Sequence, residues 1–290
     1  KRTPEPILPL SLFRNPIFAV ASTATFLTGM AMFGAILFIP LFVQGVSGSS
    51  ATNSGLVLTP MMLGAVVSST ISGQILSRWS HYRYLALAGM GLMTTGISLM
   101  VMLDRGTSNA EVARNMVIIG LGLGVSFPVF TIVVQNAFPY GLMGLVTASI
   151  QFFRSIGGAL GVAIMGALLA SRLSGNLLSN LSEEAREALG PQRLAEIQEP
   201  NALINPQALE GLKSHFADMG EEGAALLESV LIAMQDALAD SLQNVFILAA
   251  ILAGLAIIVV AFLKEIPLRK AHHPQAEPRL ESRTKSPGPA

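Results

Sequence analysis

Long apolar stretches separated by short polar ones dominate the sequence. No Lys, Arg, Asp or Glu occurs from Asn15 to Ser77, a run of 63 residues. A helix needs about 20 apolar residues to cross a bilayer, so this run predicts two membrane spans joined by a polar hairpin. Read in the same way, the whole chain predicts an all-α membrane protein with six transmembrane helices, at residues 17–43, 55–76, 85–103, 116–138, 144–171 and 241–263.

The longest polar interruption covers residues 172–240 and is acidic. It holds twelve Asp and Glu residues against four basic ones, Arg172, Arg186, Arg193 and Lys213. Three stretches in it have helical spacing, and the last leads directly into the sixth predicted span. A loop of this length usually has structure or a function of its own. We therefore expect an extracytoplasmic helical segment that either rests on the membrane surface as an amphipathic cap or binds a periplasmic or other outer partner.

Basic residues indicate which ends of the predicted spans face the cytoplasm, because short cytoplasmic flanks are enriched in Lys and Arg. The two terminal flanks and the loop between the second and third spans hold Lys1, Arg2, Arg14, Arg78, Arg83, Lys264, Arg269, Lys270, Arg279, Arg283 and Lys285. We therefore predict a cytoplasmic linker at residues 1–16, both termini of this segment in the cytoplasm, and a disordered, Pro-rich cytoplasmic tail at 264–290.

Composition agrees with a membrane protein and argues against several other classes. Hydrophobic residues make up 51% of the chain and charged residues 12%, whereas soluble domains carry about 25% charged residues. The sequence has no cysteine, and its four histidines lie outside the predicted spans. Phosphate-binding loops and HExxH motifs are also absent. We expect no catalytic residues, no metal site, no cofactor and no nucleic-acid partner.

The fourth predicted span combines glycines, a proline and polar residues. Gly120 and Gly124 form a small-xxx-small pair that lets another helix approach closely. Pro128 leaves a backbone carbonyl without its helical partner and allows a kink. Around and beyond the proline lie Phe127, Thr131 and Gln135. The pattern is typical both of an interior packing seam and of a helix that lines a substrate path.

An arginine and a row of glycines stand out in the fifth predicted span. At a 4-3-4-3 spacing, one stripe of this helix carries Thr147, Gln151, Arg154, Gly158, Gly161 and Met165, with Gly157 beside it. Lipid cannot satisfy these polar groups, so the stripe is predicted to be buried against other helices or to face a wet cavity. Arg154 lies about 15 Å into the helix, near mid-bilayer, where an arginine costs about 2.5–3.5 kcal/mol.

Two roles would offset the cost of Arg154. The side chain would pair with carbonyl groups or a carboxylate as a structural clamp, or it would line a transport cavity and bind charge. No predicted span has an Asp or Glu in its core, since Asp104 and Asp240 lie at span ends. A carboxylate partner would therefore belong to another chain, to a part of the protein outside this sequence or to the substrate.

The first predicted span is mostly apolar. Met30, Met32, Phe33, Phe38 and Phe42 either form an adaptable wall around varied ligands or simply pack and face lipid. Gln44, near the far end of the span, is its polar exception. Candidates for a substrate cavity are therefore Met30, Phe33, Gln44, Phe127, Thr131, Gln135, Thr147, Gln151 and Arg154.

The order of several motifs resembles the C-terminal portion of fourteen-span drug:proton antiporters of the major facilitator superfamily, the EmrB/QacA type. The resemblance runs from about Leu8 to Leu263 and includes PLSLFRNPIFA, GLGLGVSFPVFTIVVQNAF, VTASIQFFRSIGGALGVAI and ALADSLQNVFILAA. Between the second and third spans, SGQILSRWSHYRY is similar to the cytoplasmic-loop motif of the superfamily. Gly73, Arg78 and Arg83 match its glycine and basic positions, but Ser77 stands where an aspartate is expected.

The resemblance implies a fold of paired six-helix bundles with a substrate site between them near the bilayer midplane. The first, second, fourth and fifth helices of this chain would face the cavity. It also implies export of amphipathic, often cationic, compounds in exchange for protons, with the proton gradient as energy source and the coupling acids in an N-terminal half that is missing here. Two alternatives remain: export of a natural product such as a lipid precursor, siderophore or amino acid, or a non-transporting six-helix scaffold.

Overall fold

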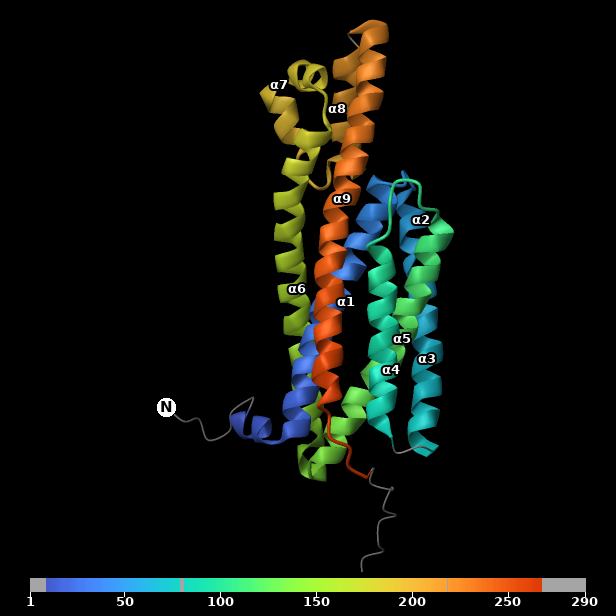
Figure 1. Ribbon diagram of the computed structural model, residues 1–290, viewed down its shortest axis with the longest axis vertical. Helices are drawn as coiled ribbons and strands as arrows, with labels where there is room; N and C mark the ends of the chain where they lie inside the picture. The colour runs from blue at the N-terminus through green and yellow to red at the C-terminus, as the bar shows by residue number, and fades with distance from the viewer. Residues whose placement is uncertain (1–8, 79–80, 218, 268–290) are drawn as a thin grey trace, which may run out of the picture.

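The computed structural model describes residues 9–78, 81–217 and 219–267, and every regular element in these ranges is helical (Figure 1). This confirms the all-α prediction for the described part of the chain. Residues 1–8 of the predicted linker and 268–290 of the predicted tail lie outside the described residues, so the disorder assigned to the tail remains a prediction.

Six long helices follow the order of the predicted spans. They are α1 (Pro16–Gly45), α3 (Leu58–Arg78), α4 (Tyr82–Met100), α5 (Asn109–Ala137), α6 (Met143–Asn180) and α9 (Gly220–Ala261). Among the described residues, five of them are long and apolar enough to cross a membrane by length and composition, and the exception is α4. This helix has 19 residues and begins with a Tyr-Arg-Tyr sequence, so its role as the third membrane span remains a prediction.

Two helices are much longer than their predicted spans. The sequence predicts a span at 144–171, but α6 has 38 residues, and α9 has 42 residues where a span is predicted at 241–263. At about 1.5 Å per residue they measure about 57 and 63 Å, about twice a hydrocarbon core of about 30 Å. The expected continuity of the last acidic stretch with the sixth span is confirmed, because α9 is unbroken.

Three shorter helices lie between the far ends of α6 and α9. These are α7 (Glu183–Ile197), the short η3 (Ala202–Ile204) and α8 (Pro206–Ala217). Together residues 172–240 form what we call the helical extension, which projects beyond one end of the bundle (Figure 1). Within α7 the backbone turns at Gly190, whose φ of 65° favours glycine, directly before Pro191.

Side-chain caps fix where several of these helices begin. The Asn15 side chain accepts a hydrogen bond from the Ile17 amide ahead of α1. At the start of α5, Ser108 and Glu111 form a reciprocal capping box. The short α2 (Ala51–Leu56) lies in the turn between α1 and α3, and η1 (Leu10–Arg14) and η2 (Tyr140–Leu142) precede α1 and α6.

The long helices pack in two groups. In one group α5 lies against α3 and α4, and in the other α1 lies against α6 and α9. The groups meet where α4 contacts α9 and where α1 and α6 contact α5. Fully buried side chains fill both groups, including Phe18, Phe42, Met90, Phe130 and Phe246. The junction of α5 with α6 places the polar candidates from the sequence next to one another.

Candidate functional site between α5 and α6

A row of polar and aromatic side chains crosses from α5 to α6. On α5 it comprises Phe127, Thr131 and Gln135, spaced four residues apart, and on α6 it comprises Thr147, Gln151 and Arg154. We call these six residues the α5–α6 polar row. The short connection through η2 makes α5 and α6 antiparallel neighbours, so the end of one part of the row meets the start of the other.

Two contacts join the helices across this row. Near the connecting turn, Gln135 Nε2 donates to Thr147 Oγ1 at 2.8 Å. Further from the turn, the guanidinium carbon of Arg154 lies 3.9 Å from the centroid of the Phe127 ring, which is cation–π geometry. Each half of the row is therefore joined across the two helices by one side-chain contact.

Arg154 has one hydrogen-bond partner within the described chain. Its Nη1 donates to Gln151 Oε1 at 2.5 Å, one turn earlier on the same helix. Its Nε and Nη2 are buried and have no hydrogen-bond partner. The two threonines of the row satisfy their own hydroxyls, since Thr131 donates to the Phe127 carbonyl and Thr147 to the Met143 carbonyl.

The predicted stripe of α6 divides into two parts. Gly158, Gly161 and Met165 are buried, as is Gly157 beside them, and this part faces α1. Gln151, in contrast, is exposed in this chain, and Arg154 and Thr147 are partly exposed. Within this chain the polar part of the stripe is therefore not fully buried against other helices, and the alternative, that it faces a wet cavity, stays a prediction. The two parts share one helix face but have different neighbours, because the glycine part packs on α1 and the polar part lies beside Phe127 and Gln135 of α5.

Three candidates on α1 do not join the row. Met30 is buried with 8% exposure, and its backbone lies against Gly161. Phe33 is 41% exposed and its ring lies against Gly158. Gln44 lies near the far end of α1 and donates to Ser54 Oγ at 2.7 Å. The structure thus gives Met30 a packing position and Gln44 a position at the α1–α3 turn, away from the row.

The predicted packing glycines lie at helix contacts, with one exception. A Cβ added at Gly120 or Gly124 would come closer than 3.0 Å to the backbone of α3. At Gly157 or Gly161 it would meet the backbone of α1 in the same way. A Cβ at Gly73 would meet nothing within 4 Å, so the expected packing role of Gly73 is not supported in the described chain.

Pro128 has the predicted effect on hydrogen bonding. Proline has no N–H, so the carbonyl four residues earlier, that of Gly124, loses its helical donor. The Ser72 hydroxyl of α3 lies 3.4 Å from this carbonyl. Sequence reasoning missed Ser72, although a stripe of small residues at Gly64, Ser68 and Ser72 was visible in the sequence and is buried against α5.

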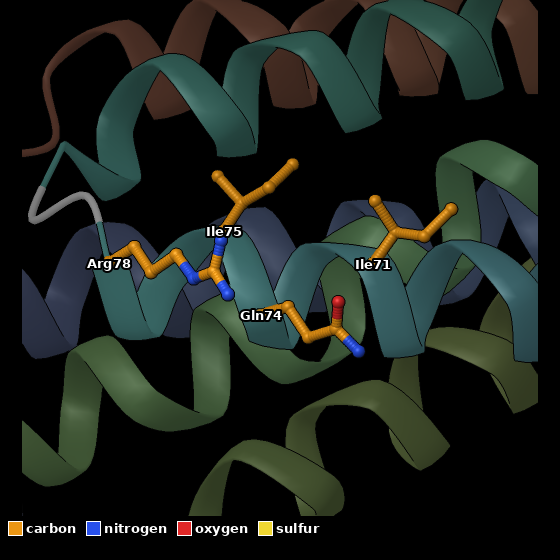
Figure 2. Close-up of a pocket in the computed structure, with 4 residues that line it drawn as sticks. All are labelled: Ile71, Gln74, Ile75 and Arg78. Atoms are coloured by element: carbon orange, nitrogen blue, oxygen red, sulfur yellow. The ribbon is translucent and has the colours of Figure 1, made fainter.

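The two basic positions of the loop motif have different surroundings. Arg83 Nη2 donates to the Ala261 carbonyl at 2.5 Å, and its backbone amide donates to Glu265. Arg78 is exposed and lines an open groove of about 300 Å³ together with Ile71, Gln74 and Ile75. Figure 2 shows the Arg78 side chain running back along α3 toward these residues. Arg83 is thus fixed to the end of α9, while Arg78 belongs to the exposed face of α3.

Comparison with known proteins identifies the family. A family model described as Major Facilitator Superfamily matches residues 1–162, more than half of the chain. The chain belongs to the major facilitator superfamily. It is a multi-pass membrane protein of a transporter family and not an enzyme, which agrees with the expectation from its sequence.

Relatives of this facilitator chain include named resistance and multidrug transporters. It is 36% identical over 289 residues to "Multidrug transporter protein MdtP" of Bacillus subtilis, covering 98% of this chain and 53% of the relative. It is 27% identical to "Tetracycline resistance determinant" of Streptomyces rimosus, covering 97% and 81%. The chain therefore spans about half the length of the Bacillus relative.

Solved structures show the same fold. A bacterial homolog of the human lysosomal transporter Spinster, in an inward-facing and unoccupied conformation, superposes with a TM-score of 0.57. The sequence identity is 16%, and the match covers 90% of this chain and 52% of that one. The facilitator chain therefore has the fold of about half of that transporter.

Proposed function

We propose that this chain forms the C-terminal six-helix bundle of a fourteen-span, proton-coupled exporter of amphipathic drugs that works by alternating access in the plasma membrane. The resemblance of its motifs to the EmrB/QacA type supports this assignment, as do the drug-related names of its relatives. Its coverage of about half of the Bacillus relative agrees with one bundle of a two-bundle transporter. In this proposal α4 is the third of the six spans, both termini are cytoplasmic and the helical extension lies outside.

The observation that carries the proposal is the α5–α6 polar row. In paired-bundle transporters the substrate site lies near the bilayer midplane between the bundles. The row provides an aromatic ring at Phe127, a cation at Arg154 and an exposed amide at Gln151 within one short stretch. An amphipathic molecule needs this combination, because apolar contacts bury most of its surface and a few polar groups fix its orientation.

Apolar surface for such a molecule is available on the neighbouring helices. The exposed side chains of α3 include Met62, Leu63, Val66, Val67 and Ile71. On α1, Phe33 is exposed beside α6. We assign α1, α3, α5 and α6 to the cavity side and the remaining long helices to its flanks.

Proton coupling in this proposal depends on parts of the transporter outside this chain. The α5–α6 polar row contains no carboxylate, and within the described chain no predicted membrane span has an Asp or Glu in its core. The proton-accepting acids are therefore expected in the N-terminal half, as the resemblance implies. The resemblance to the EmrB/QacA type also implies that the proton gradient is the energy source and that no cofactor is needed.

Dye efflux from proteoliposomes tests the proposed function. The full-length protein would be reconstituted with ethidium inside the vesicles, and an imposed pH gradient is expected to drive dye export. An ionophore that collapses the gradient is expected to stop it. If export continues at the same rate without a gradient, proton antiport is ruled out. If no dye moves while the purified protein binds it, the chain belongs to an amphipath-binding protein that does not export drugs.

A further inference from the structure

Arg154 holds most of its hydrogen-bonding capacity buried and unused. A guanidinium group has five N–H donors, and three of them are on Nε and Nη2. Both nitrogens are buried, and neither has a partner in the described chain. Buried donors without acceptors are rare in folded proteins and costly. The Nε and Nη2 donors of Arg154 therefore require a hydrogen-bond acceptor that the described residues do not supply.

The unused donors lie on one edge of the guanidinium plane. Gln151 occupies Nη1, so the free pair is Nε and Nη2. The N–H bonds of this pair point in parallel, and two parallel N–H groups match the two oxygens of a carboxylate. The guanidinium carbon lies over the Phe127 ring, 3.9 Å from its centroid. The arrangement thus presents a flat cation with one bidentate edge.

The neighbouring helix α1 also has unpaired hydroxyls. Ser22 Oγ and Thr25 Oγ1 are buried without hydrogen-bond partners. They lie on the stretch of α1 whose Phe26 and Gly29 backbone faces Gly157 and Arg154 of α6. A hydroxyl both donates and accepts hydrogen bonds, so Ser22 and Thr25 are able to donate to the oxygens of a ligand that enters between the two helices.

The described chain has no carboxylate in reach of Arg154. Its ion pairs within 4 Å are Arg105 with Asp236 and Arg193 with Glu196. Both pairs involve the helical extension, far along the sequence from the α5–α6 polar row. A lone cation at this depth of a bilayer is unfavourable, so a negative partner from elsewhere would offset its cost.

We propose that Arg154 is a carboxylate-binding residue whose free Nε–Nη2 edge takes a carboxylate from outside the described chain. That carboxylate is carried either by an amphipathic substrate or by an Asp or Glu of the rest of the transporter. The proposal rests on the proposed function to the extent that the α5–α6 polar row faces the path between two bundles. It adds that a carboxylate, and not only a cationic or apolar group, is recognised there.

A pair of dyes tests whether the carboxylate that binds Arg154 comes from the substrate. Rhodamine 110 carries a free carboxylate, and rhodamine 123 is its methyl ester. Fluorescence polarisation would measure binding of each dye to the purified full-length protein. If the substrate supplies the carboxylate, wild type prefers rhodamine 110 by about tenfold, the value expected of a charge-assisted hydrogen-bonded pair. Arg154→Gln then loses this preference.

Thermal melting tests whether the carboxylate comes from an Asp or Glu of the transporter itself. If an Asp or Glu of the transporter supplies the carboxylate, neither protein prefers one dye, and Arg154→Gln lowers the melting temperature by about 5 °C or more, because it leaves a buried carboxylate unpaired. Arg172→Gln is the matched control, since Arg172 is exposed on the same helix. It is expected to change neither measurement.

A second variant keeps the test decisive if Arg154→Gln does not fold. Arg154→Lys retains the charge but lacks the planar edge, so it is expected to lose part of the dye preference or part of the thermal stability. The proposal is overturned if the folded variants match wild type in both measurements. Because binding and melting need no proton gradient, a failure of gradient-driven export would refute the proposed function without deciding the role of Arg154.

Discussion

At the scale of single residues, glycines set how closely the helices approach. Gly120 and Gly124 of α5 and Gly157 and Gly161 of α6 each face the backbone of a partner helix. Within a bilayer the lipid is as apolar as the side chains, so association depends on close van der Waals contact. Each of these glycines brings two backbones together where a methyl group would separate them.

We expect Gly161→Ala to lower the free energy of unfolding by about 1–3 kcal/mol. The added Cβ would come closer than 3.0 Å to the backbone of Met30, which cannot move aside as a side chain can. Thermal melting of the full-length protein in detergent measures the effect. Gly175→Ala, on the same helix with nothing within 4 Å of its Cβ, is the control and is expected to be neutral or slightly stabilising. Equal melting of the two variants would contradict a contact role for Gly161.

At the scale of helices, a short segment after α9 ties several helix ends together. The Tyr82 hydroxyl at the start of α4 donates to the Lys264 carbonyl at 2.7 Å and accepts from the Ile266 amide at 2.6 Å. Asn136 Nδ2, near the end of α5, donates to the Pro267 carbonyl at 3.1 Å. Residues 262–267 therefore hold the ends of α4, α5 and α9 at one site.

We expect Tyr82→Phe to loosen this segment and leave the bundle folded. The substitution leaves the Lys264 carbonyl and the Ile266 amide without their partner, at a cost of about 1–3 kcal/mol. Amide hydrogen exchange at residues 262–266 is expected to accelerate about tenfold or more. Tyr84→Phe is the control, because Tyr84 is 69% exposed. Unchanged exchange in Tyr82→Phe would show that other contacts hold the segment.

The sequence predicted the order of the long helices but not their full lengths. Apolar windows end where charge begins, yet a helix that leaves the bilayer continues as long as its residues favour helix. Arg172 lies inside α6, although the polar segment was expected to begin there, whereas the continuity of α9 through Asp236 and Asp240 was predicted from helical spacing. Polarity therefore located the predicted membrane boundary and gave no information on the end of the helix.

The sequence predicted which residues of α5 and α6 form the candidate site, but not how they pair across the two helices. Regular spacing on α5 and α6 identified all six residues of the polar row, because side chains four residues apart share a helix face. The pairing of Gln135 with Thr147 depends on how two helices cross, and a single sequence does not contain that information. Gln44 was misplaced for the same reason, since its partner Ser54 lies across a turn.

At the scale of the whole molecule, the helical extension is joined firmly to the bundle. Asn176 Nδ2 of α6 donates to Ser241 Oγ of α9 at 3.0 Å, where the two helices enter the extension. Asp236 of the extension also forms an ion pair with Arg105, in the segment after α4, with 3.8 Å between Arg105 Nε and Asp236 Oδ1. The α6 and α9 helices also run without a break from one region into the other. These connections predict that the extension and the bundle move as one body.

A disulfide between α6 and α9 tests this prediction. The chain has no cysteine, so Asn176→Cys with Ser241→Cys would introduce one defined pair into a full-length background without other cysteines. We expect the oxidised protein to export dye at the rate of the reduced protein, because the two helices do not need to slide. The single-cysteine variants are the controls for oxidation. A loss of export that a reducing agent restores would show that α6 and α9 shift against each other.

The length of α9 has a mechanical consequence for such a body. About 20 residues of α9 lie beyond the predicted membrane span, which makes a rigid lever of about 30 Å. If the bundle rocks during alternating access, a tilt of about 10° would swing the tip near Glu221 sideways by about 5 Å. A small tilt of the bundle inside the membrane would then produce a larger sideways movement of the α9 tip, which spectroscopic labels attached at that tip would detect.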